Sequence, residues 1–441
     1  MDTILAHYQR HFDTFDYDEA LRYLEVLPPL FGDTPSTDLV ALFATTHERL
    51  GEARLERGSG EAVAGATSID AATRRTANRE AAIHFGHAAR YFRDHAEAVT
   101  VSDDQAHGSS LWSAAVNFDR ARLWKEAIEV LSQFQATRPS DPRRVDAAFM
   151  LAMAYKANGA HRRAVEHFES LIREHPKTRQ AHASRVPLAR CHIALEQLDR
   201  ALAELNHVVG NNDVVTPDSK EYLVSLIELG KLHYQMEDYE AAISRLQEAV
   251  VRAPEHDAIG LLYAYLGDAY RMSIAQLDVD LQEGTTQSRS VALWRERTRR
   301  LEAAKAAFGS AIDQLESRDA ASRSPLEELY LRNSYFYRAD SDFVLGRYAS
   351  AIDLYHAAIK RWDEHPSSLV AWMQIVNAHC ELKQFQDARV ELGNAQFALQ
   401  RMPEDAFDDP NLPINREHWR QWFQWTSELG LYAQTEVDEG P

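Results

Sequence analysis

The sequence predicts an all-α protein of about nine stacked helix-turn-helix repeats with a capping helix near the C-terminal end. Its 441 residues exceed the usual size of a single hydrophobic core, which favours several domains or a repeat array. An alanine recurs along the chain in similar apolar surroundings, and apolar residues flank it at three- and four-residue steps, as on one face of a helix. A single hairpin cannot bury both of its apolar faces, so such repeats have to stack.

The stretch from Tyr222 to Pro254 is the clearest repeat. Gly230 and Ala242 are small, which lets the two helices of the hairpin cross closely. Pro254 lacks the amide hydrogen that another helical turn would need, so it ends the second helix. The positions that carry the pattern are Leu226, Leu229, Gly230, His233, Ala242, Leu246, Ala249 and Pro254.

This pattern resembles the tetratricopeptide repeat, in which Trp-x2-Leu-Gly-x2-Tyr is followed by Ala-x3-Phe and then by Pro. Here Leu226 stands for the tryptophan, His233 for the tyrosine and Leu246 for the phenylalanine. The resemblance implies a right-handed α-solenoid whose concave face is lined by the first helix of each repeat. It further implies a protein that binds partners. The Lys, Asn and Arg set with which co-chaperone members hold a C-terminal carboxylate is absent from the equivalent positions.

The small residue that opens the second helix predicts nine repeats. The middle repeats keep a regular spacing, whereas the steps from Ala20 to Ala81 and from Ala242 to Ala304 are stretched. We divide the chain into degenerate repeats with an extended hairpin (1–100), regular repeats (101–256), repeats with a second long insertion (257–403), and an acidic loop with the capping helix and tail (404–441). The small residues are Ala20, Ala81, Ala127, Ala164, Ala201, Ala242, Ala304, Ala351 and Ala388.

The first five repeats differ in how well they follow the pattern. Tyr8 occupies the crossing position of the first, which makes that hairpin a degenerate copy. Extra residues between Gly51 and Ala81 predict prolonged helices around a loop near 58–70. The third and fourth repeats are regular and end at Pro139 and Pro176, and the fifth ends in a polar loop at 210–213 instead of a proline.

The later repeats contain the second insertion. The seventh opens at Tyr263 and then runs through about twenty-five extra residues, so its second helix is expected to be long and to begin near Ser290. The eighth and ninth follow the pattern around Ala351 and Ala388. After Pro403 an acidic loop leads to a last helix over about 415–434.

Counting helical positions from the repeat pattern along the first helix of each repeat predicts which side chains line the concave face. Such a groove would suit an extended peptide or a partner helix. Some of these side chains could instead touch only the neighbouring repeat. The predicted groove residues are Trp112, Phe149, Met153, Arg190, Ile227, Lys231, Tyr234, Tyr265, Asp268, Arg271, Phe336 and Asn377.

Two further features could contact partners. The second insertion carries Arg289, Arg295, Arg297, Arg299, Arg300 and Lys305, which could meet an acidic partner but are more simply explained as a solvated face balanced by Glu296 and Glu302. The last helix holds Trp419, Trp422, Phe423, Trp425 and Leu429 over more than half of its circumference. We expect it to cap the ninth repeat, leaving a tryptophan that could dock another protein.

Composition and motifs give no sign of an enzyme. The glycine spacing at 60–67 resembles a phosphate loop, but Ala66 replaces its lysine and no strand precedes it. The pairs His7 with His11, and His84 with His87, show no third metal ligand in sequence. The histidines that repeat at the position of His192, His233 and His379 are interpreted as core residues. We predict no catalytic residue, cofactor or metal site.

The remaining exclusions come from charge and hydropathy. Lys and Arg number 48 against 67 Asp and Glu, a net charge of −19 that disfavours nucleic acid as a partner. The sequence shows neither a secretory signal near His7 and His11 nor an apolar run long enough to span a membrane, so a cytoplasmic location is expected. Cys191 and Cys380 are expected to be buried thiols rather than a disulfide.

The sequence therefore predicts a non-enzymatic scaffold that binds a protein or peptide in a concave groove. One alternative is the regulatory region of a larger, possibly enzymatic protein. A second is a bacterial envelope-assembly factor, since the spacing of repeats three to five looks like that of periplasmic members of the family. The sequence names neither the partner nor the oligomeric state.

Overall fold

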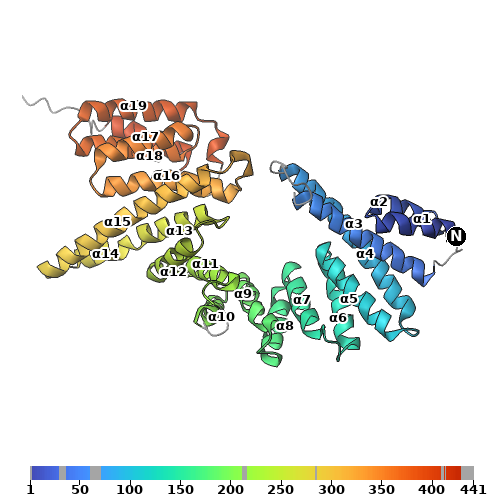
Figure 1. Cartoon of the computed structure of the whole chain (residues 1–441). Helices are drawn as coiled ribbons and strands as arrows, with labels where there is room; N and C mark the ends of the chain where they lie inside the picture. Colours follow the sequence, from blue (N-terminus) through green and yellow to red (C-terminus); the bar gives the residue numbers. More distant parts are fainter. Residues whose placement is uncertain are drawn as a thin grey trace, which may run out of the picture. The chain divides into compact units, whose positions relative to one another are not determined.

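The computed structural model describes residues 2–28, 36–59, 71–210, 216–283, 286–408, 412 and 414–428. Every regular element within these ranges is a helix (Figure 1), which confirms the predicted all-α class. The chain forms two compact units, an N-terminal unit of residues 1–215 and a C-terminal unit of residues 216–441. No helix in the described part of the chain is both long and apolar enough to cross a membrane.

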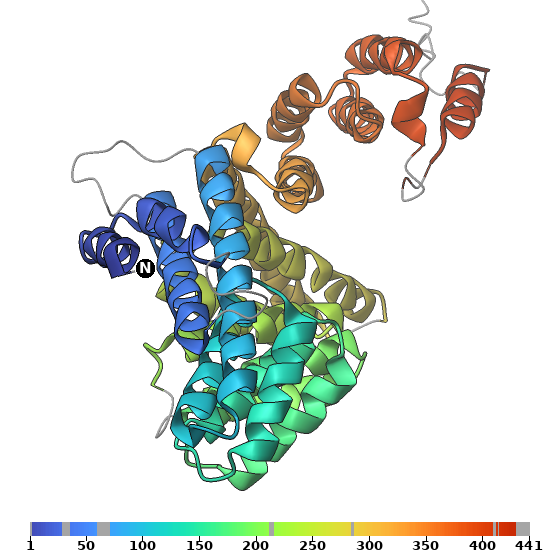
Figure 2. The ribbon, with the colours of Figure 1, turned by 90° about the vertical axis from the view of Figure 1, so that its right-hand side faces the viewer.

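The N-terminal unit is a stack of helix pairs, and short turns join the helices from α4 to α10. Consecutive helices pack against each other from α2 to α10, and Figure 2 shows α4 to α8 lying side by side. Short connections make neighbouring helices antiparallel. The helices are α1 (Asp2–Asp13), α2 (Tyr17–Glu25), α3 (Thr37–Ser59), α4 (Ala71–Val99), α5 (Asp104–Arg120), α6 (Trp124–Thr137), α7 (Arg144–Ala157), α8 (His161–Glu174), α9 (Arg179–Ala194) and α10 (Leu198–Gly210).

The C-terminal unit continues the same alternation, and its first helices α11, α13, α16 and α18 contact one another in that order. They therefore form a common face, called here the first-helix face. The helices are α11 (Lys220–Gln235), α12 (Tyr239–Arg252), α13 (Ile259–Met272), α14 (Ile274–Gln282), α15 (Gln287–Glu316), α16 (Pro325–Val344), α17 (Tyr348–Arg361), α18 (Ser367–Glu381), α19 (Phe385–Arg401) and α20 (Arg416–Glu428). Two short 3₁₀ turns, Ala320–Ser322 and Asp405–Phe407, precede α16 and α20.

The alanines that open the second helices are all buried, as the repeat pattern requires. Each exposes at most 1% of its surface, and each lies in the second helix of a helix pair. Large apolar side chains surround them, such as Phe118, Leu131 and Phe134 around Ala127. The spacing of small residues therefore located the helix crossings correctly.

Glycines in the first helices allow the second helices to approach closely. A Cβ placed on Gly51 would lie 2.6 Å from Phe85 Cε1, and one on Gly230 would lie 2.7 Å from Leu246 Cδ2. At Gly267 the nearest atom would be Phe308 Cδ1, at 2.8 Å. A real side chain does not tolerate such distances, so each aromatic or leucine fills the space that glycine leaves open.

The stretched repeats contain long helices, as predicted. In the second repeat, α3 has 23 residues and α4 has 29. In the seventh, α15 has 30 residues and begins at Gln287, close to the predicted Ser290. The insertion before it also contains α14, which follows α13 after the single residue Ser273 and packs on α15. The predicted loops around 58–70 and 210–213 lie mostly outside the described residues.

Helix α20 caps the ninth repeat. Trp419 and Phe423 are 5% and 4% exposed and pack on Leu392, Leu399 and Met402. Trp425, on another side of α20, is 60% exposed. The last helix was expected to cap the ninth repeat and to leave a tryptophan exposed. Both expectations are confirmed for its described residues, because one flank is buried and Trp425 is at the surface. Leu429 lies outside the described residues.

The recurring histidines bridge turns rather than simply filling the core. His192 is buried, but His233 and His379 are only partly buried. Each Nδ1 lies within hydrogen-bond distance of the side chain five residues later, at 2.9 Å from Gln197, 3.1 Å from Asp238 and 2.9 Å from Gln384. The core interpretation was incomplete because a polar ring at a helix end can tie the following turn. Cys380 likewise is half-buried, whereas Cys191 is buried as expected.

The close crossing at Gly230 gives a stability prediction for the C-terminal unit. Gly230→Ala should lower the free energy of unfolding by about 1–3 kcal/mol, because the new methyl group overpacks Leu246. Gly309→Ala is the matched control, since no atom lies within 4 Å of its Cβ position in α15. The control should stabilise the helix by about 0.5–1 kcal/mol through helix propensity. Urea unfolding measures both, and a neutral or stabilising Gly230→Ala would contradict the crossing geometry.

Candidate functional site

A row of four tyrosines connects three consecutive repeats of the C-terminal unit. The ring centroids of Tyr239 and Tyr234 are 5.9 Å apart, those of Tyr234 and Tyr265 are 5.6 Å apart, and those of Tyr265 and Tyr330 are 4.8 Å apart. Tyr234 lies on α11, Tyr239 starts α12, Tyr265 lies on α13 and Tyr330 on α16. We call these four residues the tyrosine ladder. All four rings are partly exposed.

A buried carboxylate and an arginine hold the ladder from below. Asp268 is 8% exposed, accepts a hydrogen bond from the Tyr234 hydroxyl, and accepts another from Arg271 Nε at 2.7 Å. The Arg271 guanidinium lies 4.3 Å from the centroid of the Tyr337 ring, a cation–π geometry. Because Asp268 is paired with a cation and a hydroxyl, its burial is tolerated, and Tyr234 is fixed in position.

The phenols of Tyr234 and Tyr330 stay neutral at physiological pH. Burial raises the pKa of Tyr234, and the hydrogen bond to Asp268 raises it further. Burial also raises the pKa of Tyr330, and a hydrogen bond with Tyr265 acts in the same direction. Neutral hydroxyls can both donate and accept hydrogen bonds, so the ladder offers apolar ring surface together with adaptable polar groups.

Behind the ladder, a second carboxylate is buried in the eighth repeat. The Tyr355 hydroxyl donates to Asp340 Oδ1 at 2.5 Å, and Tyr355 is 1% exposed. Burial raises the pKa of Asp340, while the Tyr355 hydrogen bond and the charge of Arg271 act against that shift. The carboxylates of Asp268 and Asp340, both under the first-helix face, are thus paired within the protein.

The predicted groove residues of the C-terminal unit separate into two groups. Tyr234, Tyr265, Asp268 and Arg271 are brought together in and under the ladder. Ile227 and Phe336 are 5% and 9% exposed, so they belong mainly to the core. Lys231 is partly exposed on α11, and Asn377 lines the separate groove described below. Tyr330 and Tyr337 were not in the predicted set.

The predicted groove residues of the N-terminal unit make mostly packing contacts. Trp112 contacts Phe134, with ring centroids 5.8 Å apart, and Phe149 contacts Phe168 at 6.3 Å. Met153 packs beside the core of the fourth and fifth repeats, and Arg190 is exposed on α9. These residues lie on three different first helices and do not form an aromatic row like the ladder.

A tryptophan-lined groove lies between α18 and α20. Its volume is about 470 Å³, and its lining contains no acidic residue, lysine or arginine. Trp425 and Ile414 are its exposed apolar members, at 60% and 36%. We call it the tryptophan groove, and its lining is Met373, Asn377, Ile414, His418, Trp419, Gln421, Trp422 and Trp425.

The arginines of α15 are mostly paired with carboxylates of the same chain, which agrees with the simpler of the two interpretations. Arg297 Nε lies 2.6 Å from Asp278, and Arg299 lies 2.6 Å from Glu296. Lys305 lies 2.6 Å from Asp342. Arg289 and Arg300 also have carboxylate partners, Asp280 and Glu240. Glu302, however, pairs with Arg347 of the next repeat rather than with this cluster.

Family models for the tetratricopeptide repeat match three stretches of the chain. One model matches residues 146–178, which contain α7 and α8. A second model of the same description matches residues 227–270 and 338–408. No curated protein sequence matches the chain.

Solved structures also resemble the chain at low sequence identity. A tetratricopeptide repeat protein from Parabacteroides merdae has 14% identity and a TM-score of 0.38, over 73% of this chain and 98% of its own. A signal-transduction ATPase with a tetratricopeptide repeat sensor, from Pyrococcus horikoshii, has 13% identity and a TM-score of 0.42, over 94% and 54%. Yeast Tom70 has 11% identity and a TM-score of 0.35, over 97% and 82%.

The buried small residues and the paired helices define a helical-hairpin repeat protein. The sequence matches specify which repeat it is. The chain contains tetratricopeptide repeats, and the matched stretches lie in both compact units.

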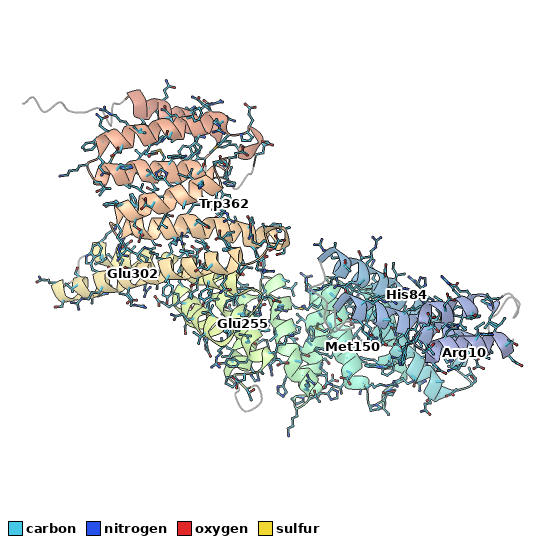
Figure 3. All side chains as sticks on the ribbon, turned by 45° about the horizontal axis from the view of Figure 1, so that its top comes forward. Arg10, His84, Met150, Glu255, Glu302 and Trp362 are labelled. Carbon is cyan, nitrogen blue, oxygen red and sulfur yellow. The ribbon has the colours of Figure 1, made fainter. Side chains whose placement is uncertain are left out.

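A histidine cluster in the N-terminal unit could not be found from sequence spacing. His84 and His87 lie on α4 (Figure 3 labels His84), and α3 places His47 against both. His47 Nδ1 lies 3.1 Å from His84 Nδ1, and the ring centroids of His47 and His87 are 5.1 Å apart. Within the described residues, no group of three or more His, Cys, Asp or Glu side chains is arranged to hold a metal ion.

The histidine cluster predicts that acid destabilises the α3–α4 hairpin. Burial lowers the pKa of His47 to about 3 and also lowers the pKa of His84. Below pH 6.5 the unfolded chain takes up protons that the folded state does not bind, so stability falls as the pH drops from 6.5 toward 3. At pH 5 the loss from His47 alone should be about 2 kcal/mol. His47→Phe should remove this part of the acid sensitivity, as measured by hydrogen exchange of α3 and α4 at pH 7.5 and 5.

Replacement of the exposed His7 by Phe is the control for that experiment, since His7 lies on α1 and outside the α3–α4 hairpin. It should leave the acid sensitivity of α3 and α4 unchanged. The assignment of this acid sensitivity to His47 would be wrong if, on acidification, α3 and α4 of His47→Phe lost as much protection from hydrogen exchange as those of the unmodified protein.

Proposed function

We propose that the chain is a binding scaffold whose C-terminal unit holds an extended peptide or a partner helix along its first-helix face. The observation that carries this proposal is the tyrosine ladder, which crosses three repeats without interruption. A partner lying along it would meet ring surface at each repeat. The chain itself would act by binding and not by catalysis.

Tyrosine suits this role for physical reasons. It offers a large contact area and loses little side-chain entropy, because it has only two rotatable bonds. Its hydroxyl can hydrogen-bond to a peptide backbone. Since Asp268 and Arg271 already fix Tyr234 from below, little ordering would be left for the partner to induce.

The charge of the C-terminal unit favours a basic partner. Residues 216–441 contain 23 Lys and Arg against 37 Asp and Glu, so most of the net charge of the chain lies in this unit. A field of this sign accelerates association with positively charged peptides and slows association with nucleic acid. The expected partner segment therefore combines apolar or aromatic anchors with lysine or arginine.

The ladder can be tested by quantitative capture from cells of the source organism. The unmodified chain should retain a stoichiometric protein, and a variant with Tyr234, Tyr265 and Tyr330 changed to Ala should retain it at least tenfold less. Tyr263→Ala is the control, because Tyr263 lies on α13 but outside the ladder. Capture should also weaken as the salt concentration rises.

Three outcomes of the capture experiment are informative about the proposed binding surface. Capture that depends on the ladder but not on Tyr263 supports the proposal. Equal capture by the ladder variant moves binding to another surface. Capture of no protein at micromolar chain concentration would contradict the scaffold function itself.

A further inference from the structure

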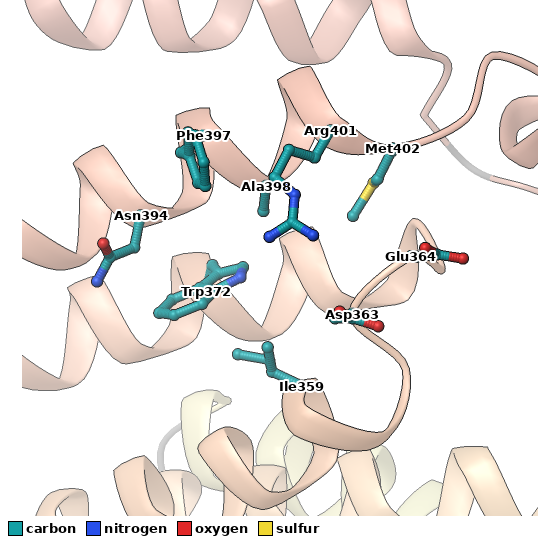
Figure 4. Close-up of a pocket in the computed structure, with 9 residues that line it drawn as sticks. All are labelled: Ile359, Asp363, Glu364, Trp372, Asn394, Phe397, Ala398, Arg401 and Met402. Atoms are coloured by element: carbon teal, nitrogen blue, oxygen red, sulfur yellow. The ribbon is translucent and has the colours of Figure 1, made fainter.

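A small pocket opens between the end of α17 and the helices α18 and α19 (Figure 4). Its volume is about 250 Å³. It lies apart from the tyrosine ladder, since the two share no residue. The pocket is lined by Ile359, Asp363, Glu364, Trp372, Asn394, Phe397, Ala398, Arg401 and Met402.

This pocket contains one buried hydrogen-bond donor without an acceptor and one exposed cation without a carboxylate partner among the described residues. The indole Nε1 of Trp372 is shielded from solvent and has no hydrogen-bond partner in the described part of the chain. Arg401, which is exposed, forms no ion pair with a described carboxylate, and its guanidinium lies 5.7 Å from the centroid of the Phe397 ring. Figure 4 shows the Trp372 indole and the Arg401 guanidinium facing each other from α18 and α19. Buried donors are normally paired, so an unpaired one calls for an acceptor from outside.

The nearest carboxylates do not supply that acceptor. Asp363 and Glu364 are exposed in the turn after α17, and Figure 4 shows both carboxylates directed away from Arg401. This contrasts with Arg361 at the end of α17, which pairs with Glu316. Arg401 is thus a cation at the pocket whose charge is left for a ligand.

Apart from Asn394, whose amide donates to Glu391, the remaining lining residues of the pocket are apolar. Ile359 and Met402 are 6% and 3% exposed, and the Trp372 ring packs edge-on against His356 at 5.5 Å. Phe397 is 60% exposed and forms the outer wall. A ligand that reached Arg401 with a charged end would therefore place the adjoining atoms against apolar surface.

We propose that this pocket binds a carboxylate that is attached to an apolar side chain. One carboxylate oxygen would accept from the Trp372 indole N–H and the other from the Arg401 guanidinium, a charge-assisted pairing. The apolar side chain would pack on Ile359, Phe397 and Met402. The same chemistry occurs in the last residue of a protein chain and in a small free acid. At about 250 Å³ the pocket is smaller than most sites for drug-sized ligands, so it would admit only a small acid or a single terminal residue.

Two probes that differ only in the charged end test the carboxylate. N-acetyl-leucine carries the free carboxylate, and N-acetyl-leucinamide replaces it by an amide. The full chain is labelled with ¹⁵N-tryptophan, and Trp372→Phe identifies the Trp372 indole signal. N-acetyl-leucine should move that signal downfield and saturate at millimolar concentration, whereas the amide should bind at least tenfold more weakly.

Arg401→Gln should weaken N-acetyl-leucine binding at least tenfold while the chain stays folded, as its other indole signals will show. Arg389→Gln is the matched control, since Arg389 lies on α19 outside the pocket and should bind like the unmodified chain. Equal affinity in Arg401→Gln would overturn the assignment, because Arg401 is the proposed cationic partner.

A second pair of probes separates the two sources of the ligand. A hexapeptide ending in a free leucine carboxylate is compared with the same peptide amidated at its C-terminus. Binding of the free peptide and of N-acetyl-leucine supports a general carboxylate pocket, and binding of the free peptide alone supports recognition of a chain terminus. A response to neither free acid, or an equal response to the amides, would contradict the proposal.

Discussion

The close approach of the two helices in each pair is the constraint on which the structure depends. Alanine and glycine are required where the helices cross, because a larger side chain there would collide with the leucine or phenylalanine that fills the gap. Each crossing also leaves the outer faces of its pair apolar, so the next pair has to cover them. A repeat is therefore stable only between neighbours or beneath a cap such as α20.

The crossings also position the candidate site. Gly267 lies two residues after Tyr265 on α13, so the contact of Gly267 with Phe308 fixes the rotation of the helix that presents the central tyrosine. The neighbouring first helices set Tyr234 and Tyr330 at either side of it. Polar groups are accepted beneath the ladder only because they are paired there, as Asp268 is with Arg271 and Asp340 with Tyr355.

Much of the fold could be predicted because its signals are local. The spacing of alanines and prolines fixed the helix pairs, and α15 begins within a few residues of the predicted start. The candidate sites could be predicted only in part, because they depend on the register between helices that are distant in sequence. Tyr330 was not predicted because the face of α16 was counted from the residues at the helix crossing. Helix α16 begins at Pro325, well before that crossing, and Tyr330 lies in this earlier part.

The histidine cluster and the pocket at Arg401 depend on the directions of side chains, which the spacing of residues in the sequence does not determine. The proximity of His47 to His84 and His87 follows from the register of two long helices, α3 and α4. The unpaired state of Arg401 depends on where Asp363 and Glu364 point. The first-helix count, by contrast, did select Tyr234 and Tyr265, whose rings the structure brings together, because residues of one helix face recur at fixed intervals. It also chose Ile227 and Phe336, which the neighbouring helices bury.

A double-mutant cycle at Gly267 and Phe308 tests the central claim most directly, because it measures whether the small residue and the ring share one space. Gly267→Ala and Phe308→Leu are each expected to destabilise the C-terminal unit by about 1–3 kcal/mol. Together they should cost clearly less than the sum of the two, since the smaller leucine makes room for the new methyl group. Strictly additive losses would mean that the two residues do not meet, and the account of the crossings would then be wrong.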